Sequence, residues 1–339
     1  MRLFSSRKTG EADAISAFWL WWDTVREDVA TAVAAGGVDR FAAGLSSRVN
    51  AINKDLHWEL APGQSSAHAL VVTAAGDPAL RSVAARWLGG APAADETWSY
   101  RSVRTADPTA FEATMQLGGQ TLALADIRYS LTVDQDRHQI DVTCYHPAFD
   151  GLPEDARGQV TFLTLDWALG EDDVEIWLRD IDWTTTEPQD PRTPRDLQQA
   201  VAAVAADDSW ALMHGQKRDG TPIMAVVASP LRSARWPRFD LHIPVGLPYR
   251  GCNDRQLPDS TSLDALRAFE DELTAALGGD GALVAHETSG RVRTLHYYVD
   301  SRSTARATVK SRLPQWREGR VSVTPRMDPA FDNVRHLMR

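Results

Sequence analysis

Three basic residues, Arg302, Arg306 and Lys310, follow one another at intervals of four in a segment with helical character. Residues four apart lie on the same face of a helix, so the three cations would share one surface. Trp316 and Arg317 lie just beyond them. Cations with an interleaved aromatic ring can hold phosphates or stack a nucleic-acid base, and they can equally dock a protein or face solvent. We take these five residues as candidates for partner binding.

Tryptophan is unusually frequent: the 339 residues contain 12 Trp, against 9 Phe and 6 Tyr. Most of the indole rings are expected in cores or domain interfaces, because a buried aromatic ring removes a large apolar area from water. Trp21 lies off the helical stripe of Trp19 and Trp22, and Trp236 lies in a segment rich in Pro and Arg. We therefore expect Trp21 and Trp236 to be exposed, and Trp236 is a candidate anchor for a partner.

An acidic run, Glu171, Asp172 and Asp173, follows the helix-ending Gly170. Neighbouring carboxylates can carry out general acid–base chemistry or bind Mg²⁺. The run lacks the spacing and the central glycine of a calcium-binding loop, so a solvated turn is the plain interpretation. If these three residues have a function, a surface that docks a protein fits them better than catalysis does.

The sequence assigns no residue to a metal, a cofactor or a catalytic step. Cys144 and His146 would share one face of a strand, but no third or fourth zinc ligand accompanies them, so we expect them to pack in the core. Cys252 has no neighbour that must activate it. The chain also contains no nucleophile elbow and no glycine-rich phosphate loop. These features argue against the common hydrolases and nucleotide-driven enzymes.

The first two thirds of the chain mix helical and strand patterns, with residues 1–10 expected as a flexible tail and residues 11–207 as an α+β domain. Ile15, Phe18 and Trp22 recur at three- and four-residue steps and predict a long amphipathic helix. Further helices are predicted at 39–53, 78–88, 153–169 and 194–206, and strands at 56–60, 67–73, 97–104, 127–133, 139–145 and 174–181.

Residues 208–339 show a more regular order. Asp219 and Gly220 predict a hairpin turn between strands at 210–216 and 223–228. Thr261 and Asp264 form a capping-box pair in front of a helix. Strands at 239–245, 282–287, 292–299 and 320–325 alternate with helices at 262–277 and 303–313. This β-α-β-β-α-β order, with an extra hairpin in front, predicts a ferredoxin-like C-terminal domain. The predicted fold class is therefore α+β with two domains.

The formal net charge of −10 averages two unlike parts. Residues 1–207 carry 17 basic and 31 acidic residues, whereas residues 208–339 carry 19 basic and 15 acidic ones. Such an asymmetry indicates partners, or the docking of one part on the other. The overall acidity argues against a protein that coats nucleic acid.

The sequence favours a cytoplasmic protein. The N-terminus lacks the apolar stretch of a secretory signal, and no window is apolar enough for a membrane span. Two thiols, with no disulfide framework, fit a reducing compartment.

Two parts of the chain resemble bacterial families. The N-terminal half is similar to the partner domain of uncharacterised two-part proteins, with Leu-Asp-x-x-Leu-Gly-Glu at 165–171 after His146-Pro147, and a Phe-Trp-x-Trp-like opening at 18–21. The part from Trp210 to about Met338 resembles domain-of-unknown-function family 695, on residues 263–277, 281–284, 288–290, 297–298 and 328–329. That family is similar in layout to the ribonuclease E inhibitor fold, so the resemblance implies a ferredoxin-like domain. It implies no catalytic residue.

Together these features predict a binding or regulatory module that is not an enzyme and acts through protein–protein contact. The alternative is an enzyme with a non-standard carboxylate site between the domains, using acids such as Asp166 and Glu171. A third interpretation is RNA binding by the C-terminal domain. The expected partner is an unidentified protein, with nucleic acid as the weaker option and no membrane.

Overall fold

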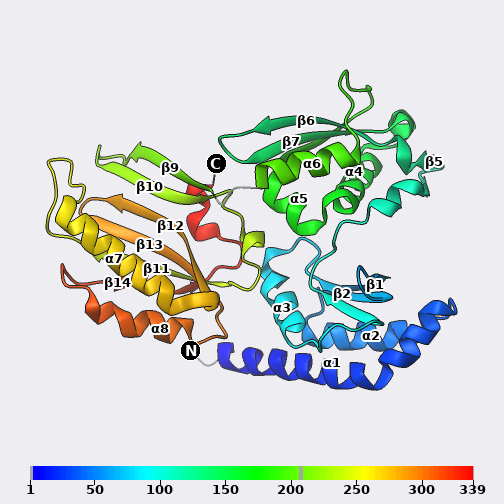
Figure 1. Ribbon diagram of the computed structural model, residues 1–339, viewed down its shortest axis with the longest axis horizontal. Coiled ribbons are helices and arrows are strands. Elements are labelled where there is room, and N and C mark those ends of the chain that lie inside the picture. The colour runs from blue at the N-terminus through cyan, green and yellow to red at the C-terminus, as the bar shows by residue number, and fades with distance from the viewer. Residues whose placement is uncertain (1–2, 206–208, 339) are drawn as a thin grey trace. The chain divides into compact units, whose positions relative to one another are not determined.

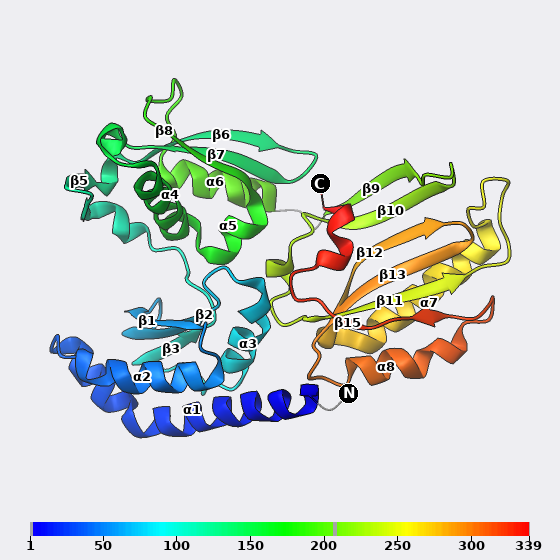
Figure 2. The ribbon, with the colours of Figure 1, turned by 180° about the vertical axis from the view of Figure 1, so that it is seen from behind.

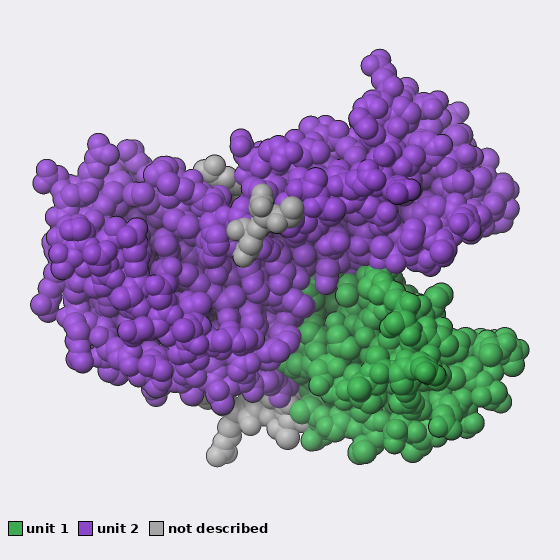
Figure 3. Space-filling model, viewed as in Figure 1, with its two compact units in different colours: residues 1–105 green, residues 106–339 purple. Residues whose placement is uncertain are grey.

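The computed structural model describes residues 3–205 and 209–338, with side chains described from Gly10 onward. The fold is mixed α+β, with helices and several separate sheets. The chain divides into two compact units, residues 1–105 and 106–339 (Figure 3). The domain boundary expected near residue 207 lies outside the described residues.

The first unit combines helices with a three-stranded sheet (Figure 1). Strand β1 (His57–Pro62) runs antiparallel to β2 (His68–Thr73), and β2 runs parallel to β3 (Trp98–Arg101). The helices are α1 (Leu3–Ala34), α2 (Asp39–Ile52) and α3 (Pro78–Gly89). Asp77 caps α3, because its Oδ1 accepts a hydrogen bond of 2.8 Å from the backbone N–H of Ala79.

Aromatic rings form the core of the first unit. Phe18 and Trp22 of α1 are fully buried, as their spacing predicted, and they pack with Trp87 of α3 and Trp98 of β3. Helix α1 begins at Leu3, so residues 3–10 are helical where a flexible tail was expected. This segment contains no proline, so nothing in it stops the packed helix from extending toward the N-terminus.

The part of the second unit before residue 206 contains a small sheet covered by helices. Strand β6 (Arg128–Asp134) runs antiparallel to β7 (Gln139–Tyr145), and β7 runs parallel to β8 (Leu178–Thr184). The helices are α4 (Glu154–Leu169), α5 (Glu171–Trp177) and α6 (Pro194–Ala205). A short hairpin, β4 (Thr114–Leu117) and β5 (Gln120–Ala123), precedes them and was not predicted.

The predicted strand at 174–181 is wrong over its first half, which is the helix α5. Val174, Ile176 and Leu178 alternate as in a strand, but Val174, Trp177 and Leu178 are also spaced as one side of a helix. Val174, Ile176 and Trp177 are all buried, so the apolar pattern fits both structures. The acidic residues just before them occupy the first helical turn, where the helix dipole favours negative charge.

Residues 209–338 are organised around a seven-stranded sheet, in which the described pairs of strands are all antiparallel. The strand order is β14-β11-β13-β12-β10-β9, and β15 also pairs with β11. The strands are β9 (Ser209–Gln216), β10 (Pro222–Ser229), β11 (Leu241–Pro248), β12 (Gly281–Ser289), β13 (Val292–Val299), β14 (Ser322–Val323) and β15 (Arg326–Met327). Helices α7 (Ser260–Leu277) and α8 (Ala305–Arg312) lie between β11 and β12 and between β13 and β14 in the chain.

The two faces of this sheet have different covers. Helices α7 and α8 pack on one face, over Leu241, Val245 and Leu295 (Figure 1). The C-terminal segment packs on the other, where Phe331 and Leu337 contact the cluster around Tyr298 (Figure 2). Alternation along β11 and β13 sends successive side chains to opposite faces, so each strand contributes to both layers.

Three local expectations meet different outcomes. The hairpin at Asp219-Gly220 is confirmed, with Gly220 at a positive φ of 83° that suits glycine. The expected capping box at Thr261 and Asp264 is wrong, since α7 starts earlier and Asp259 caps it by accepting from the N–H of Ser262 at 3.0 Å. The strand expected at 320–325 is replaced by β14 and β15, which flank Pro325, a residue without an N–H to donate.

Among the described residues, no helix combines the length and the apolar character needed to cross a membrane.

Candidate functional site

A groove beside α8 brings together two of the predicted cationic residues and an apolar floor. We call it the α8 groove; it has a volume of about 240 Å³. Its lining residues are Ile243, Arg306, Val309, Lys310, Leu313, Val323 and Pro325. Ile243 and Val309 are buried and form the floor, while Arg306 and Lys310 are exposed beside it. The groove therefore offers an apolar contact with two positive charges at its edge.

The chain segment that contains α8 and its flanks is strongly positive. Residues 301–327 contain seven basic residues and one acidic residue, Glu318. The Glu318 carboxylate is already engaged, because its Oε2 accepts from the Ser262 hydroxyl at 2.6 Å and from the Arg250 N–H at 2.9 Å. Within residues 3–205 and 209–338, neither Arg306 nor Lys310 has a carboxylate in ion-pair distance. Their charge is thus available to a partner.

The other members of the predicted basic face are not on α8. Arg302 lies in the turn before the helix, where its backbone N–H donates to Asp300 Oδ1 at 2.9 Å. Arg317 is exposed beyond the helix. The spacing of four therefore places Arg306 and Lys310 together on the helix, but not Arg302.

Trp316 is a correction to the predicted contact residues. Its side chain is buried, its Nε1 donates to the Pro248 carbonyl at 2.8 Å, and its ring packs edge-on against Phe269 at 5.6 Å. The indole thus closes the core between α7 and β11 and presents no surface to a partner. Its neighbours Arg317 and Gln315 gave a polar context that concealed this burial in the sequence.

Trp236 and Trp21 are half-buried, where exposure was expected. The Trp236 ring stacks on Phe331 at 5.9 Å, and the Arg235 guanidinium lies over it at 5.0 Å. The strongly exposed indole is instead that of Trp210, on the edge strand β9. The sequence around Trp210 predicted a strand, but nothing in it indicated that this strand would lie at the edge of the sheet.

The acidic run forms the first turn of α5 and is half-buried, where a solvated turn was expected. Burial raises the pKa of Asp173, although the Trp177 Nε1 donates to its Oδ1 at 3.1 Å. Glu171 and Asp172 also make interactions within the structure. The run therefore acts mainly as a helix start, which weakens its case as a docking face.

Cys144 and His146 are both buried, as expected for core residues. Both ring nitrogens of His146 are used by the backbone: Nδ1 accepts from the Ala148 N–H, and Nε2 lies 3.0 Å from the Ala123 carbonyl. Among the described residues, no group of three or more His, Cys, Asp or Glu side chains is arranged to hold a metal ion.

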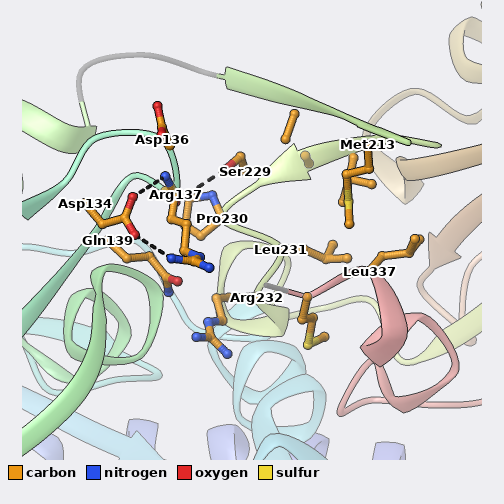
Figure 4. Close-up of a pocket in the computed structure, with 14 residues that line it drawn as sticks. Asp134, Asp136, Arg137, Gln139, Met213, Ser229, Pro230, Leu231, Arg232 and Leu337 are labelled. Carbon is orange, nitrogen blue, oxygen red and sulfur yellow. Dashed lines mark hydrogen bonds and ion pairs between the residues drawn. The ribbon is translucent and has the colours of Figure 1, made fainter. Parts of the chain in front are cut away.

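A second cavity, of about 220 Å³, lies in the second unit beside the β6–β7 turn (Figure 4). Asp134 and Arg137 form part of one wall, and Met213, Leu231 and Leu337 part of another. The Asp134 carboxylate accepts from Arg137 Nη1 at 2.7 Å and from Arg179 Nη1 at 3.1 Å.

The charges in this cavity are largely satisfied within the protein. Hydrogen bonds from Arg137 hold the pKa of Asp134 below its usual value, so the carboxylate stays ionised and is a poor proton donor. The buried Gln139 amide oxygen accepts from Arg232 Nη2 at 3.0 Å. Neither Asp166 nor Glu171 lines the cavity, so the acids named for the enzymatic alternative do not meet there.

A hydrogen-bonded chain on the face opposite α8, which runs from the buried His242 and His296 to the exposed His336, was not predicted from the sequence. Glu287 Oε1 lies 2.8 Å from His336 Nε2 and 3.0 Å from His296 Nε2, within hydrogen-bond distance of both. His296 Nδ1 lies 3.1 Å from His242 Nε2. Burial would raise the pKa of Glu287, but the hydrogen bonds from His296 and His336 outweigh it and lower that pKa. The members come from three strands and the C-terminus, so no local spacing could have revealed them.

Comparison of the chain with protein-family models, with curated proteins and with solved structures finds no match. The function must therefore be argued from the chemistry of the sites themselves.

Proposed function

We propose that the chain is a non-enzymatic binding or regulatory module that acts through contact with a protein, and that the α8 groove is its docking site. The observation that carries the proposal is the pairing of Arg306 and Lys310, which have no carboxylate partner among the described residues, with the apolar floor at Ile243 and Val309. Charge complementarity selects an acidic peptide with an apolar side chain as the occupant.

Each part of such a peptide would have a distinct role. The apolar side chain would enter the groove and supply affinity by burying area that is now wet. The carboxylates would face Arg306 and Lys310, which steers the encounter and sets the orientation. A nucleic-acid strand would instead require aromatic rings on which bases stack. The nearest ring in the sequence, Trp316, is buried, and this favours a protein over RNA.

The proposal includes a ferredoxin-like C-terminal domain in a cytoplasmic protein of two domains, 11–207 and 208–339. The order β11-α7-β12-β13-α8-β14 and the sheet order β14-β11-β13-β12 support the ferredoxin-like assignment. They agree with the resemblance to domain-of-unknown-function family 695 and to the layout of the ribonuclease E inhibitor. Two unpaired cysteines support a reducing location.

Fluorescence anisotropy of the full chain with a labelled peptide of alternating Glu and Leu residues tests the proposal. We expect saturable binding that weakens by roughly tenfold or more, about 1.4 kcal/mol, in the double variant Arg306→Glu/Lys310→Glu. The matched control is Lys217→Glu/Arg218→Glu, an equal charge reversal at the exposed turn between β9 and β10, which should bind like the unmodified protein. A peptide with Gln in place of Glu should bind more weakly.

Three outcomes would overturn the assignment. One is the absence of saturable binding to the acidic peptide. Another is equal weakening by the control variant, which would indicate nonspecific attraction to net charge. The third is tighter, strongly salt-dependent binding of a labelled single-stranded RNA that Arg306→Glu/Lys310→Glu abolishes, which would assign the surface to nucleic acid.

A further inference from the structure

A third cavity, on the α7 side of the seven-stranded sheet, has a mostly apolar lining and one buried cation. Its volume is about 250 Å³. Side chains from β9, β10, the loop before α7 and the first turn of α7 make the apolar part: Leu212, Met224, Val226, Leu257, Pro258 and Leu263. The cation is the guanidinium of Arg293 on β13, a residue that is only 7% exposed. The cavity is separate from the α8 groove, since the two share no lining residue.

The Arg293 guanidinium is only partly satisfied by the protein. Its Nε donates to Thr288 Oγ1 at 3.0 Å. In the part of the chain that the structure describes, no carboxylate lies within ion-pair distance of Arg293, and its two Nη groups have no hydrogen-bond acceptor. Neither Nη atom is among the described polar atoms that are fully buried without a partner, so both are accessible from the cavity, where an anionic group would pair with them.

The charges around Arg293 leave room for such a group. Burial lowers the Arg293 pKa, and Arg267 lowers it further, whereas Glu270 and Tyr249 raise it. The Glu270 carboxylate is engaged elsewhere, since its Oε2 lies 3.0 Å from His286 Nδ1. Glu270 therefore moderates the positive potential without supplying Arg293 with a direct partner.

We propose that this cavity binds a small organic carboxylate with an apolar body. The two Nη groups of Arg293 present the parallel donors that match the two oxygens of a carboxylate. The apolar body lies against Met224, Val226 and Leu263. The cavity volume lies below the usual range of small-molecule sites, about 300–1,000 Å³, so the ligand is small. A phosphate monoester of a sugar fits less well, because its hydroxyls would lose hydrogen bonds to water against these walls.

Isothermal titration calorimetry of the full chain with hexanoate tests the site. Hexan-1-ol has the apolar body without the charge, and inorganic phosphate has charge without the body. We expect saturable binding of hexanoate and binding of the other two that is weaker by roughly tenfold or more. Arg293→Met should weaken hexanoate binding by a similar factor. Val226→Phe, which fills the cavity and keeps the cation, should weaken it too. Arg335→Met, a change to an exposed arginine of the C-terminal segment on the other face of the sheet, is the control and should leave binding unchanged.

Stability without ligand separates a binding role of Arg293 from a purely structural one. Removal of an uncompensated buried charge should leave the thermal midpoint of Arg293→Met equal to or above that of the unmodified protein. A large fall in that midpoint would identify Arg293 as a structural residue and overturn the proposal. So would unchanged hexanoate binding by Arg293→Met, equally tight binding of phosphate, or no saturable heat with hexanoate at millimolar concentration.

Discussion

The imidazoles of His242 and His296 meet edge to edge, with ring planes 6° apart and ring centroids 5.3 Å apart, and a hydrogen bond of 3.1 Å joins His242 Nε2 to His296 Nδ1. His296 Nε2 faces the carboxylate of Glu287, so it carries a proton and donates. The hydrogen bond between the two rings needs one donor and one acceptor, so protonation of both rings would remove it and would place two positive charges in contact inside the protein.

This arrangement predicts a specific dependence of stability on pH. Burial, and then the neighbouring His296, lower the pKa of His242 to about 4, against roughly 6.5 in an unfolded chain. Between these two values the unfolded chain binds a proton that the folded chain does not. The free energy of unfolding should therefore fall as the pH drops from about 6.5 to about 4, and the contribution of His242 should level off below that.

Urea denaturation across this pH range provides the measurement. In His242→Phe, which keeps a flat ring beside Tyr298, the fall should be shallower than in the unmodified protein. His214→Phe, at an exposed position of β9, should keep the original slope. An unchanged slope in His242→Phe would show that other groups cause the dependence.

The Tyr298 hydroxyl and the Asp328 carboxylate should be strongly coupled. Both residues are buried, and the hydroxyl donates to Asp328 Oδ2 at 2.6 Å. Asp328 also accepts from the backbone N–H groups of Asp332 and Asn333, so it fixes the start of the C-terminal segment against the sheet. A double-mutant cycle of Tyr298→Phe and Asp328→Asn should give a coupling of roughly 1–3 kcal/mol in the free energy of unfolding. Additive effects of the two changes would contradict this.

Two adjacent tryptophans should differ widely in their importance for stability. Trp22 is fully buried, donates from Nε1 to the Tyr100 hydroxyl at 3.0 Å, and packs edge-on against Trp98 at 4.9 Å. Trp21 is half-buried, with the Arg48 guanidinium 4.7 Å from its ring. Trp22→Ala should lower the free energy of unfolding by about 3–5 kcal/mol, and Trp21→Ala by about 1 kcal/mol. Equal losses in urea denaturation would be inconsistent with this packing.

The two cysteines should react at very different rates with a thiol reagent. Cys144 is buried, and burial raises its pKa to about 12, so almost no thiolate forms near neutral pH. Cys252 is half-exposed. Ellman's reagent should titrate one thiol quickly in the native protein and the second only after unfolding. Cys252→Ser should remove the fast phase; a fast phase that remains would mean that Cys144 is accessible.

Local patterns predicted the elements best where a single period was present. The helix of Ser260–Leu277 and the strands around Gln139–Tyr145 and Val292–Val299 agree with their spacing. The prediction failed at Val174–Trp177, where the same apolar residues fit both a strand and a helix. It also missed the short hairpin Thr114–Ala123, whose mixed composition gives no clear alternation.

The sequence by itself determined that Arg306 and Lys310 share one side of a helix, because that follows from the spacing of four alone. Only the tertiary structure decided what lies beside them: an apolar floor from Ile243, far away in the chain, and no acidic partner among the described residues. The same holds for the burial of Trp316 and of Arg293. Spacing depends on the geometry of one element, whereas burial and charge pairing depend on which strands, distant in sequence, become neighbours in the sheet.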